Sequence, residues 1–185
     1  MKQAVLVNGV PASGKSTVTR QLIRGLQTQG AAAMPLCLDT VKEGLFAQIG
    51  TGDREHNRML GRASYHAIFN LIAEMPDNVL PVIDAWHGFQ PETVLRDHLA
   101  RAGIQHVVEI WVSIPPEEAA RRYRARADGR HAGHLPASYA DELFALAGRA
   151  RPLALGAVIS LDGSQAVPGD LARRVLGELQ LAGAG

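Results

Sequence analysis

The chain has 185 residues, enough for one domain with a substantial core, and its 46% hydrophobic and 20% charged content is that of a soluble globular protein. Its 19 Lys and Arg balance 18 Asp and Glu, so no charge excess favours a long nucleic acid or a membrane surface as partner. The single cysteine, Cys37, excludes an internal disulfide and a cysteine metal cluster, and no apolar stretch reaches the roughly 18 residues of a membrane span.

A phosphate-binding loop follows the first predicted strand. The apolar run at residues 2–8 predicts this strand, and the pattern G-x-x-x-x-G-K-[ST] comes directly after it. The glycines allow a tight turn whose backbone N–H groups surround phosphate oxygens, while Lys15 reaches the terminal phosphates and Ser16 Oγ binds Mg²⁺. The predicted nucleotide-binding residues of this loop are Gly9, Val10, Pro11, Ala12, Ser13, Gly14, Lys15, Ser16 and Thr17.

Strand and helix patterns alternate along the rest of the chain. A capping-box pattern at residues 40–43 predicts that a helix starts there, directly after the second strand. The alternation predicts an α/β fold in which helices cover both faces of a parallel sheet. Further strands are predicted over residues 33–38, 79–83, 107–112 and 155–161, and helices over residues 14–29, from 40, 56–75, 91–102, from 115, from 138 and 171–181.

Two aspartates follow predicted strands, at the sheet edge where α/β proteins bind their ligands. Asp39 suits the general base that accepts the proton of an attacking hydroxyl, with a helix cap as its alternative role. Thr40 weakens that alternative because it already opens the capping box. Asp84 suits Mg²⁺ or its waters, with a bond to the local backbone as its alternative. Three aromatic residues follow Asp84 and could either line an acceptor pocket or belong to the core: Trp86, His87 and Phe89.

An arginine-rich tract begins in the helix predicted from residue 115. It contains Arg121, Arg122, Arg124, Arg126 and Arg130. The first two follow glutamates at the favourable i,i+4 spacing, which is typical of a solvated helix face. Arg124, Arg126 and Arg130 have no such partner in the sequence and lead into a glycine-flanked loop. We therefore expect a mobile lid over residues 124–137 that closes on polyphosphate, in which Arg126 and Arg130 are catalytic and Arg124 binds nucleotide.

Together these segments resemble the small phosphate-loop kinases that act on metabolites and antibiotics. Residues 36–40, 82–85 and 110–122 are similar to chloramphenicol phosphotransferase, residues 130–136 resemble the lid of gluconate kinases, and the zeta-toxin kinases share the same plan. The resemblance implies ATP as donor, Mg²⁺, Asp39 as base and a lid arginine at the γ-phosphate. It also implies a three-layer phosphate-loop fold whose five-stranded parallel sheet has the order 2-3-1-4-5.

The main hypothesis is an ATP-dependent kinase that phosphorylates a hydroxyl of a small molecule. Alternatives are a nucleotide-sugar kinase like the zeta toxins, a polynucleotide 5′-hydroxyl kinase, against which the balanced charge argues, and an ATP-binding switch module. We expect residues 1–185 to form one cytoplasmic domain, as a monomer or homodimer, without a leader because the first strand begins almost at Met1. The stretch at residues 41–70, where we expect acceptor contacts, matches no family pattern.

Overall fold

Strands and helices alternate along residues 1–183, the part of the chain that the computed structural model describes. The strands are β1 (Lys2–Asn8), β2 (Ala33–Cys37), β3 (Leu80–Asp84), β4 (Ile104–Ser113) and β5 (Ala157–Asp162). The helices are α1 (Lys15–Thr28), α2 (Leu38–Ile49), α3 (Arg54–Glu74), α4 (Glu92–Arg101), α5 (Pro116–Ala125), α6 (Tyr139–Arg149) and α7 (Leu171–Gly183), with short 3₁₀ helices η1 (His87–Phe89) and η2 (Ala127–Gly129). Within this range, no helix combines the length and the apolar character needed to cross a membrane.

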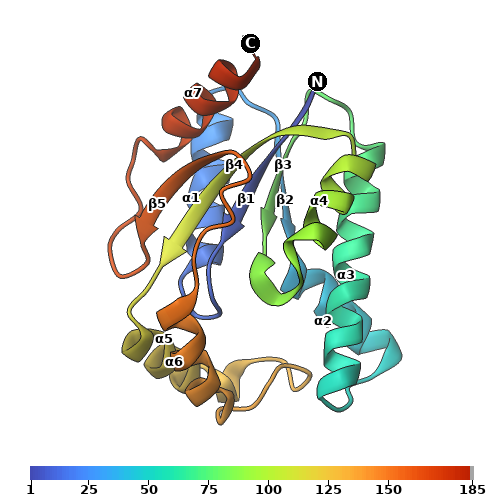
Figure 1. The fold of residues 1–185 in the computed structure, drawn as a ribbon, viewed down its shortest axis with the longest axis vertical. Coiled ribbons are helices and arrows are strands. Elements are labelled where there is room, and N and C mark those ends of the chain that lie inside the picture. Colours follow the sequence, from blue (N-terminus) through green and yellow to red (C-terminus); the bar gives the residue numbers. More distant parts are fainter. Residues whose placement is uncertain (184–185) are drawn as a thin grey trace.

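The strands form one parallel sheet in the order β2-β3-β1-β4-β5, which confirms the predicted order (Figure 1). β1 lies at the centre, where Val5 pairs with Val82 of β3 on one side and with Val108 of β4 on the other. The pairing between β3 and β1 starts at Val82, while Pro81 pairs only with Met34 of β2. The residue without an N–H donor therefore lies outside the central ladder.

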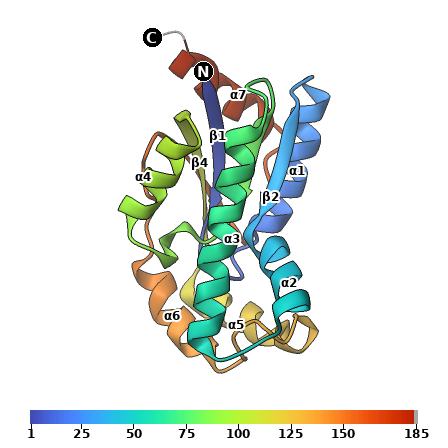
Figure 2. The ribbon, with the colours of Figure 1, turned by 90° about the vertical axis from the view of Figure 1, so that its right-hand side faces the viewer.

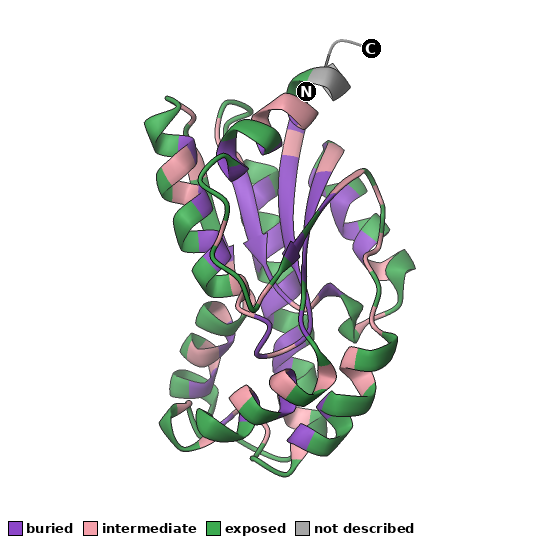
Figure 3. Ribbon diagram, turned by 90° about the vertical axis from the view of Figure 1, so that its left-hand side faces the viewer, coloured by how far each residue is buried: buried purple, intermediate pink, exposed green. Residues whose placement is uncertain are grey.

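Helices cover both faces of the sheet and give the molecule three layers (Figure 2). α1 and α7 pack on one face, and α3 and α4 pack on the other. Val5 and Val7 of β1 belong to the first core, whereas Ala4 and Leu6 belong to the second, because successive side chains of a strand point to opposite faces. Figure 3 shows the buried residues concentrated in the strands and on the inner sides of the helices.

A third apolar cluster lies beyond the carboxyl ends of the strands, where α5 and α6 pack against each other (Figure 1). Val10 and Ala12 of the phosphate loop are buried in this cluster, against Ala119 and Tyr123 of α5 and Leu143 of α6. Close packing against two helices restricts the loop to one conformation. The same two helices therefore support the phosphate loop and lead into the predicted lid.

The junction of β2 and α2 differs from the prediction. β2 ends at Cys37 and α2 begins at Leu38, so the predicted capping box at residues 40–43 is wrong. Thr40 lies inside the first turn, and the N-cap is Cys37, whose extended backbone turns directly into the helix without a side-chain cap bond. Asp39 consequently lies in the first turn of α2, where a negative charge interacts favourably with the helix dipole.

Candidate active site

The phosphate loop has the backbone geometry of an anion cradle. Ala12 and Gly14 have φ of 67° and 102°, and alternation of left-handed with right-handed residues turns successive N–H groups toward one point. Gly9 has φ of 155°, and a Cβ there would lie 2.5 Å from the carbonyl oxygen of Val112. The buried Ser13 Oγ has no hydrogen-bond partner within residues 1–183. A tight loop whose backbone N–H groups converge fits a polyphosphate, because that ligand supplies acceptors to such donors.

A buried polar network fixes the start of this loop. Asn8 Oδ1 accepts hydrogen bonds from the backbone N–H of Gly9 at 2.8 Å and of His87 at 3.1 Å. Asn8 Nδ2 donates to Glu109 Oε1 at 2.7 Å, and the fully buried Glu109 also accepts from the backbone of Leu153 and Ala154. Neither Asn8 nor Glu109 was predicted as a site residue, although each is a polar residue among the apolar residues of its strand, and that pattern could have revealed them.

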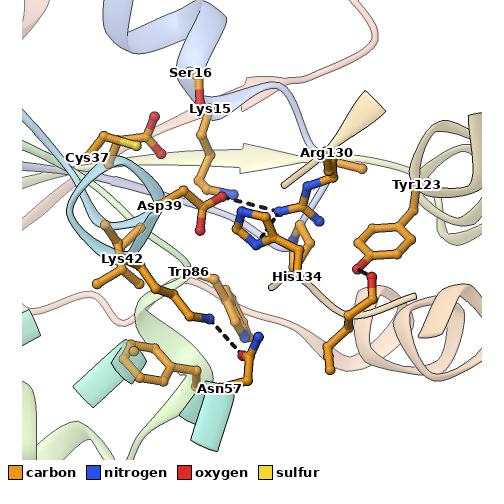
Figure 4. Close-up of a pocket in the computed structure, with 18 of the residues that line it drawn as sticks. Lys15, Ser16, Cys37, Asp39, Lys42, Asn57, Trp86, Tyr123, Arg130 and His134 are labelled. Carbon is orange, nitrogen blue, oxygen red and sulfur yellow. Dashed lines mark hydrogen bonds and ion pairs between the residues drawn. The ribbon is translucent and has the colours of Figure 1, made fainter. Parts of the chain in front are cut away.

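A cleft of about 530 Å³ opens beside the loop, between α2, α3 and the segment that links α5 to α6. Figure 4 shows part of its lining. The cleft brings together Lys15 and Ser16 of the loop end, the two aspartates, and Arg126 and Arg130 of the lid. The other predicted loop residues that line it are Pro11, Ala12, Gly14 and Thr17. Gly9, Val10 and Ser13 lie behind this wall and shape the loop from within.

Lys15 holds its amine against the phosphate loop. Its Nζ donates to the carbonyl oxygen of Val10 at 3.0 Å. Burial lowers the pKa of Lys15, and the charges of Asp84 and Asp39 oppose this shift. Asp84, which is 4% exposed at the end of β3, has its pKa raised by burial, and Lys15 opposes that shift in turn. The two carboxylates and the amine are therefore electrostatically coupled within one site.

Asp39 is the accessible carboxylate of this site. Its side chain is 56% exposed, and its Oδ2 lies 3.4 Å from Arg130 Nη2. It lies in the first turn of α2 and not at the predicted strand end, and neither it nor Thr40 caps α2 through a side-chain bond. The carboxylate faces the cleft beside Lys15 in Figure 4. Asp39 is thus free to meet a ligand, whereas the buried Asp84 is held close to the phosphate loop.

The lid segment makes polar and aromatic contacts with α2, α3 and α5. Arg130 donates to Nδ1 of His134 at 3.0 Å, so the proton of the neutral ring is on Nε2. This Nε2–H donates to Glu43 Oε1 at 2.7 Å. Asn57 Nδ2 donates to the carbonyl oxygen of Gly133. Arg130 also lies 5.4 Å from the ring centre of Tyr123. These contacts place residues 130–134 directly over the Asp39 side of the cleft.

The arginines of the tract separate into two groups. Arg126 and Arg130 line the cleft, and burial followed by the charge of Arg130 lowers the pKa of Arg126. Arg124, which was expected to bind nucleotide, does not line the cleft, and its guanidinium pairs with Asp141 of α6 at 2.6 Å. The i,i+4 pairing is also only half present, because Glu118 binds both Arg121 and Arg122.

The aromatic residues after Asp84 also fall into two groups, those that line the cleft and one that is buried. Trp86 and Phe89 line the cleft, as an acceptor pocket requires. His87 is 2% exposed instead, and its Nδ1 lies 2.7 Å from the hydroxyl of Tyr65. Burial lowers the pKa of His87 to about 3, which keeps the ring neutral. His87 therefore belongs to the core.

Several lining residues come from the stretch at residues 41–70, where acceptor contacts were expected. They are Lys42, Arg54, Asn57, Arg58, Gly61 and Arg62. Lys42 follows Asp39 by three residues and so shares its face of α2, a spacing that could have identified it. The arginines recur every fourth residue on α3, which is also a readable pattern.

The donor set suits Mg²⁺ better than a transition metal. Residues 1–183 contain no group of three His, Cys, Asp or Glu side chains that could hold a metal ion. The groups beside the loop are instead the hydroxyl of Ser16 and the carboxylate of Asp84, which are oxygen donors. Mg²⁺ takes few protein ligands and completes its shell with waters and phosphates. Ser16 and Asp84 could therefore hold Mg²⁺ together with a bound triphosphate.

Comparisons with known proteins agree with this fold. A protein-family model described as "AAA domain" matches residues 5–146. A candidate kinase from Chloroflexus aurantiacus j-10-fl superposes with a TM-score of 0.76 and 23% identity, over 97% of this chain and 99% of that chain. The Mycobacterium tuberculosis APS kinase CysC, in complex with AMPPNP and APS, gives a TM-score of 0.63 and 22% identity over 97% and 98%.

A sugar kinase from Janibacter sp. HTCC2649 gives a TM-score of 0.55 and 22% identity, over 100% of this chain and 98% of that chain. The comparison with curated proteins returned no match. At these identities the likeness shows a shared fold. The predicted small phosphate-loop kinase fold is confirmed.

Proposed function

This chain belongs to the AAA-domain family, and from that membership we propose that it is an ATP-dependent phosphotransferase acting on a hydroxyl of a small molecule. The observation that carries the proposal is the placement of Asp39, an accessible carboxylate in the same cleft as Lys15. A triphosphate cradle alone would support only binding. An accessible acid beside it adds the group that accepts a proton from an attacking alcohol. The kinase-fold neighbours support the same reaction class.

In the proposed reaction, the acceptor oxygen attacks the γ-phosphorus of ATP and the bond to the β-phosphate oxygen breaks, which releases ADP. Asp39 takes the proton of the acceptor hydroxyl. Lys15, Arg126 and Arg130 stabilise the negative charge that spreads over the migrating phosphoryl group. Mg²⁺, held through Ser16 and Asp84, would neutralise further phosphate charge. Closure of the lid over Asp39 when both substrates are bound would exclude water, which is the competing acceptor.

The nucleoside end of ATP has a candidate site on the other side of the loop. A second cleft contains Gly14 and Thr17, which also line the first, and extends to Arg122 and the loop after β5. Arg122 Nη1 donates to the carbonyl oxygen of Gly163 at 2.9 Å, which joins the two walls of this second cleft. We place the base and ribose there, because the phosphate loop then lies between nucleoside and acceptor.

The acceptor side favours a small molecule over a polymer. The first cleft is bounded by the lid on one side and by α3 on the other, and its volume of about 530 Å³ lies within the usual range for small-ligand pockets. ATP as donor is consistent with a cytoplasmic enzyme. We propose that this enzyme is either a monomer or a homodimer. Arg124 has no part in this proposal, because Asp141 neutralises it outside the cleft.

Two variants test the proposal. Asp39→Asn should leave ATP affinity within about threefold and reduce phosphoryl transfer at least about 100-fold, because the amide keeps the size of the side chain but cannot accept the proton. Lys15→Ala should reduce ATP affinity as well as transfer. Calorimetric titration with ATP and an assay of labelled phosphate transfer measure the two effects. If Asp39→Asn keeps most of the wild-type transfer rate, the assignment of the base is wrong.

A further inference from the structure

The cleft carries a charge imbalance that the whole chain does not. Eight lysine and arginine side chains line it against two aspartates, whereas the net charge of the chain is +1. Like charges gathered in one cleft repel each other and raise the local electrostatic potential. Three of these cations, Lys15, Arg126 and Arg130, are already assigned to the triphosphate. Of the other five, Arg20 lies on α1, and the remaining four lie on α2 and α3, on the acceptor side.

Lys42 is the most informative cation of that side. It is 9% exposed, and its Nζ donates to Asn57 Oδ1 at 2.7 Å and lies 5.4 Å from the ring centre of Phe46. None of the ion pairs found within residues 1–183 includes Lys42. Burial lowers its pKa, and Asp39 opposes the shift. A buried ammonium carries three donors, and the neutral Asn57 satisfies only one of them.

The position of Lys42 also suits contact with a phosphoryl acceptor. It lies one helical turn after Asp39, and in the view of Figure 4 the Asp39 carboxylate lies between the amines of Lys15 and Lys42. A ligand whose hydroxyl reaches Asp39 from the acceptor side would therefore present its next groups to Lys42. Trp86 and Phe89 offer apolar surface for the rest of such a ligand.

The arginines of α3 extend the positive surface. Arg58 and Arg62 share one acid, Glu55, at 4.0 and 3.0 Å, so this pair of cations keeps a net positive charge. Arg54 differs, because both its terminal nitrogens bind Glu142 of α6. Two exposed guanidiniums at the rim and one buried ammonium inside form a path of positive charge that leads to Asp39.

We propose that the phosphoryl acceptor is itself an anion, a hydroxyl compound that also carries a carboxylate, phosphate or sulfate group, and that Lys42 binds this group while Asp39 receives the hydroxyl. This inference rests on the proposed kinase activity and names its substrate class. The anion completes the hydrogen bonds of the buried ammonium and offsets the repulsion among the lining cations. Lys42 is thereby the residue that distinguishes charged acceptors from neutral analogues.

A paired acceptor screen tests this. The panel contains hydroxyl compounds matched so that each pair differs in one anionic group: D-gluconate with D-glucose, glycerate with glycerol, and adenosine 5′-monophosphate with adenosine. With ATP as donor, the anionic member of an accepted pair should have a kcat/KM at least about tenfold higher than its neutral partner. Comparison of carboxylate and phosphate members then identifies which anion the site prefers.

Variants of Lys42 give the second readout. Lys42→Met should raise the KM for the anionic acceptor by about 10- to 100-fold, the usual effect of losing a hydrogen bond to a charged group, and leave the KM for ATP within about twofold. Lys42→Arg keeps the positive charge and should retain the preference for anions. Arg24→Gln removes a positive charge from the exposed face of α1, outside the cleft, and serves as the control. Thermal unfolding verifies that each variant is folded.

The outcomes separate the two proposals. If neutral members are phosphorylated as well as anionic ones, or if Lys42→Met leaves the discrimination unchanged, the anionic acceptor is wrong while the kinase assignment stands. If the protein binds ATP and phosphorylates no member of either series, both the acceptor class and the small-molecule kinase assignment fail.

Discussion

Gly9 shows how one missing side chain shapes the phosphate loop. An added Cβ would lie 2.5 Å from the backbone oxygen of Val112 and 2.7 Å from Ser13 Oγ, at a φ of 155°. The first of these atoms belongs to the backbone of β4 and cannot move aside without disturbing the sheet. A substitution at Gly9 must therefore displace the loop from its position against β4.

We expect Gly9→Ala to lower the free energy of unfolding by about 2 kcal/mol or more and to abolish ATP binding, because strain and a backbone clash act together. Gly30→Ala is the matched control: its φ is +78°, but nothing lies within 4 Å of the added Cβ. That variant should cost only about 1 kcal/mol and keep ATP affinity. Urea denaturation and ATP titration measure both effects, and equal losses in the two variants would contradict this reading.

Single residues also mark the limits of prediction from this sequence. Lys15, Ser16, Asp39 and Asp84 could be singled out from the sequence, because their chemistry is tied to a motif or to the end of a predicted strand, and all four line the cleft. Lys42 was not found, because a lysine in an amphipathic helix is usually solvated, and only the tertiary packing buries it. The error at Arg124 has the same cause, since its partner Asp141 is on a different helix and invisible to i,i+4 spacing.

At the scale of elements, one of the contacts between the lid and α2 is especially close. Gly133 lies so near the Phe46 ring that an added Cβ would be 2.5 Å from it. Phe46 is 3% exposed and stacks on His131 with ring centres 5.2 Å apart, so it has little room to move. The lid position over Asp39 therefore depends on the absence of a side chain at residue 133.

Gly133→Ala should displace the lid and lower kcat/KM for phosphoryl transfer several-fold to tenfold, with a smaller effect on global stability, because the strain is local. Gly129→Ala lies in the same segment with nothing within 4 Å of the new Cβ, and it should behave like the wild type. Limited proteolysis of residues 124–137 gives a readout that is independent of activity. Equal cleavage rates in both variants would show that the contact with Phe46 does not hold the lid.

Element boundaries were predicted less well than element types. The alternation of strands and helices was correct throughout, because long apolar periodicities report buried faces. The start of α2 was predicted two residues too late, because the T-x-x-E pattern at residues 40–43 is equally compatible with the interior of a helix. Glu43 instead binds His134 across the cleft, a tertiary contact that took the side chain away from capping.

For the whole molecule, the order of the sheet was predictable and the interior polar groups were not. Parallel sheets with a phosphate loop after the first strand have few topologies, so the order β2-β3-β1-β4-β5 followed from the resemblance. The buried histidines depend on three-dimensional packing. His87 contacts Tyr65, which lies 22 residues earlier in the chain, and no local pattern encodes such a distance.

His87 makes the stability of the molecule depend on pH. Burial lowers the pKa of His87 to about 3, below the ordinary value of 6.5. Burial also lowers the pKa of His98, to about 4. Between these lowered pKa values and 6.5, the unfolded chain therefore binds more protons than the folded one. The contribution of the two neutral rings to the free energy of unfolding is fully present above about pH 6.5 and decreases as the pH falls. The raised pKa of Asp84 acts in the opposite sense, because the folded state holds that proton more tightly.

We expect His87 to remove on the order of 2 kcal/mol of unfolding free energy between pH 7 and pH 5. Urea denaturation at both values should show a smaller decrease for His87→Gln than for the wild type, because the uncharged amide has no proton to gain. NMR titration of the His87 ring in the folded protein gives an independent check, since its signals should stay in the neutral position at pH 5. A ring that titrates near pH 6.5, or an unchanged pH slope in the variant, would mean that burial does not hold this histidine neutral.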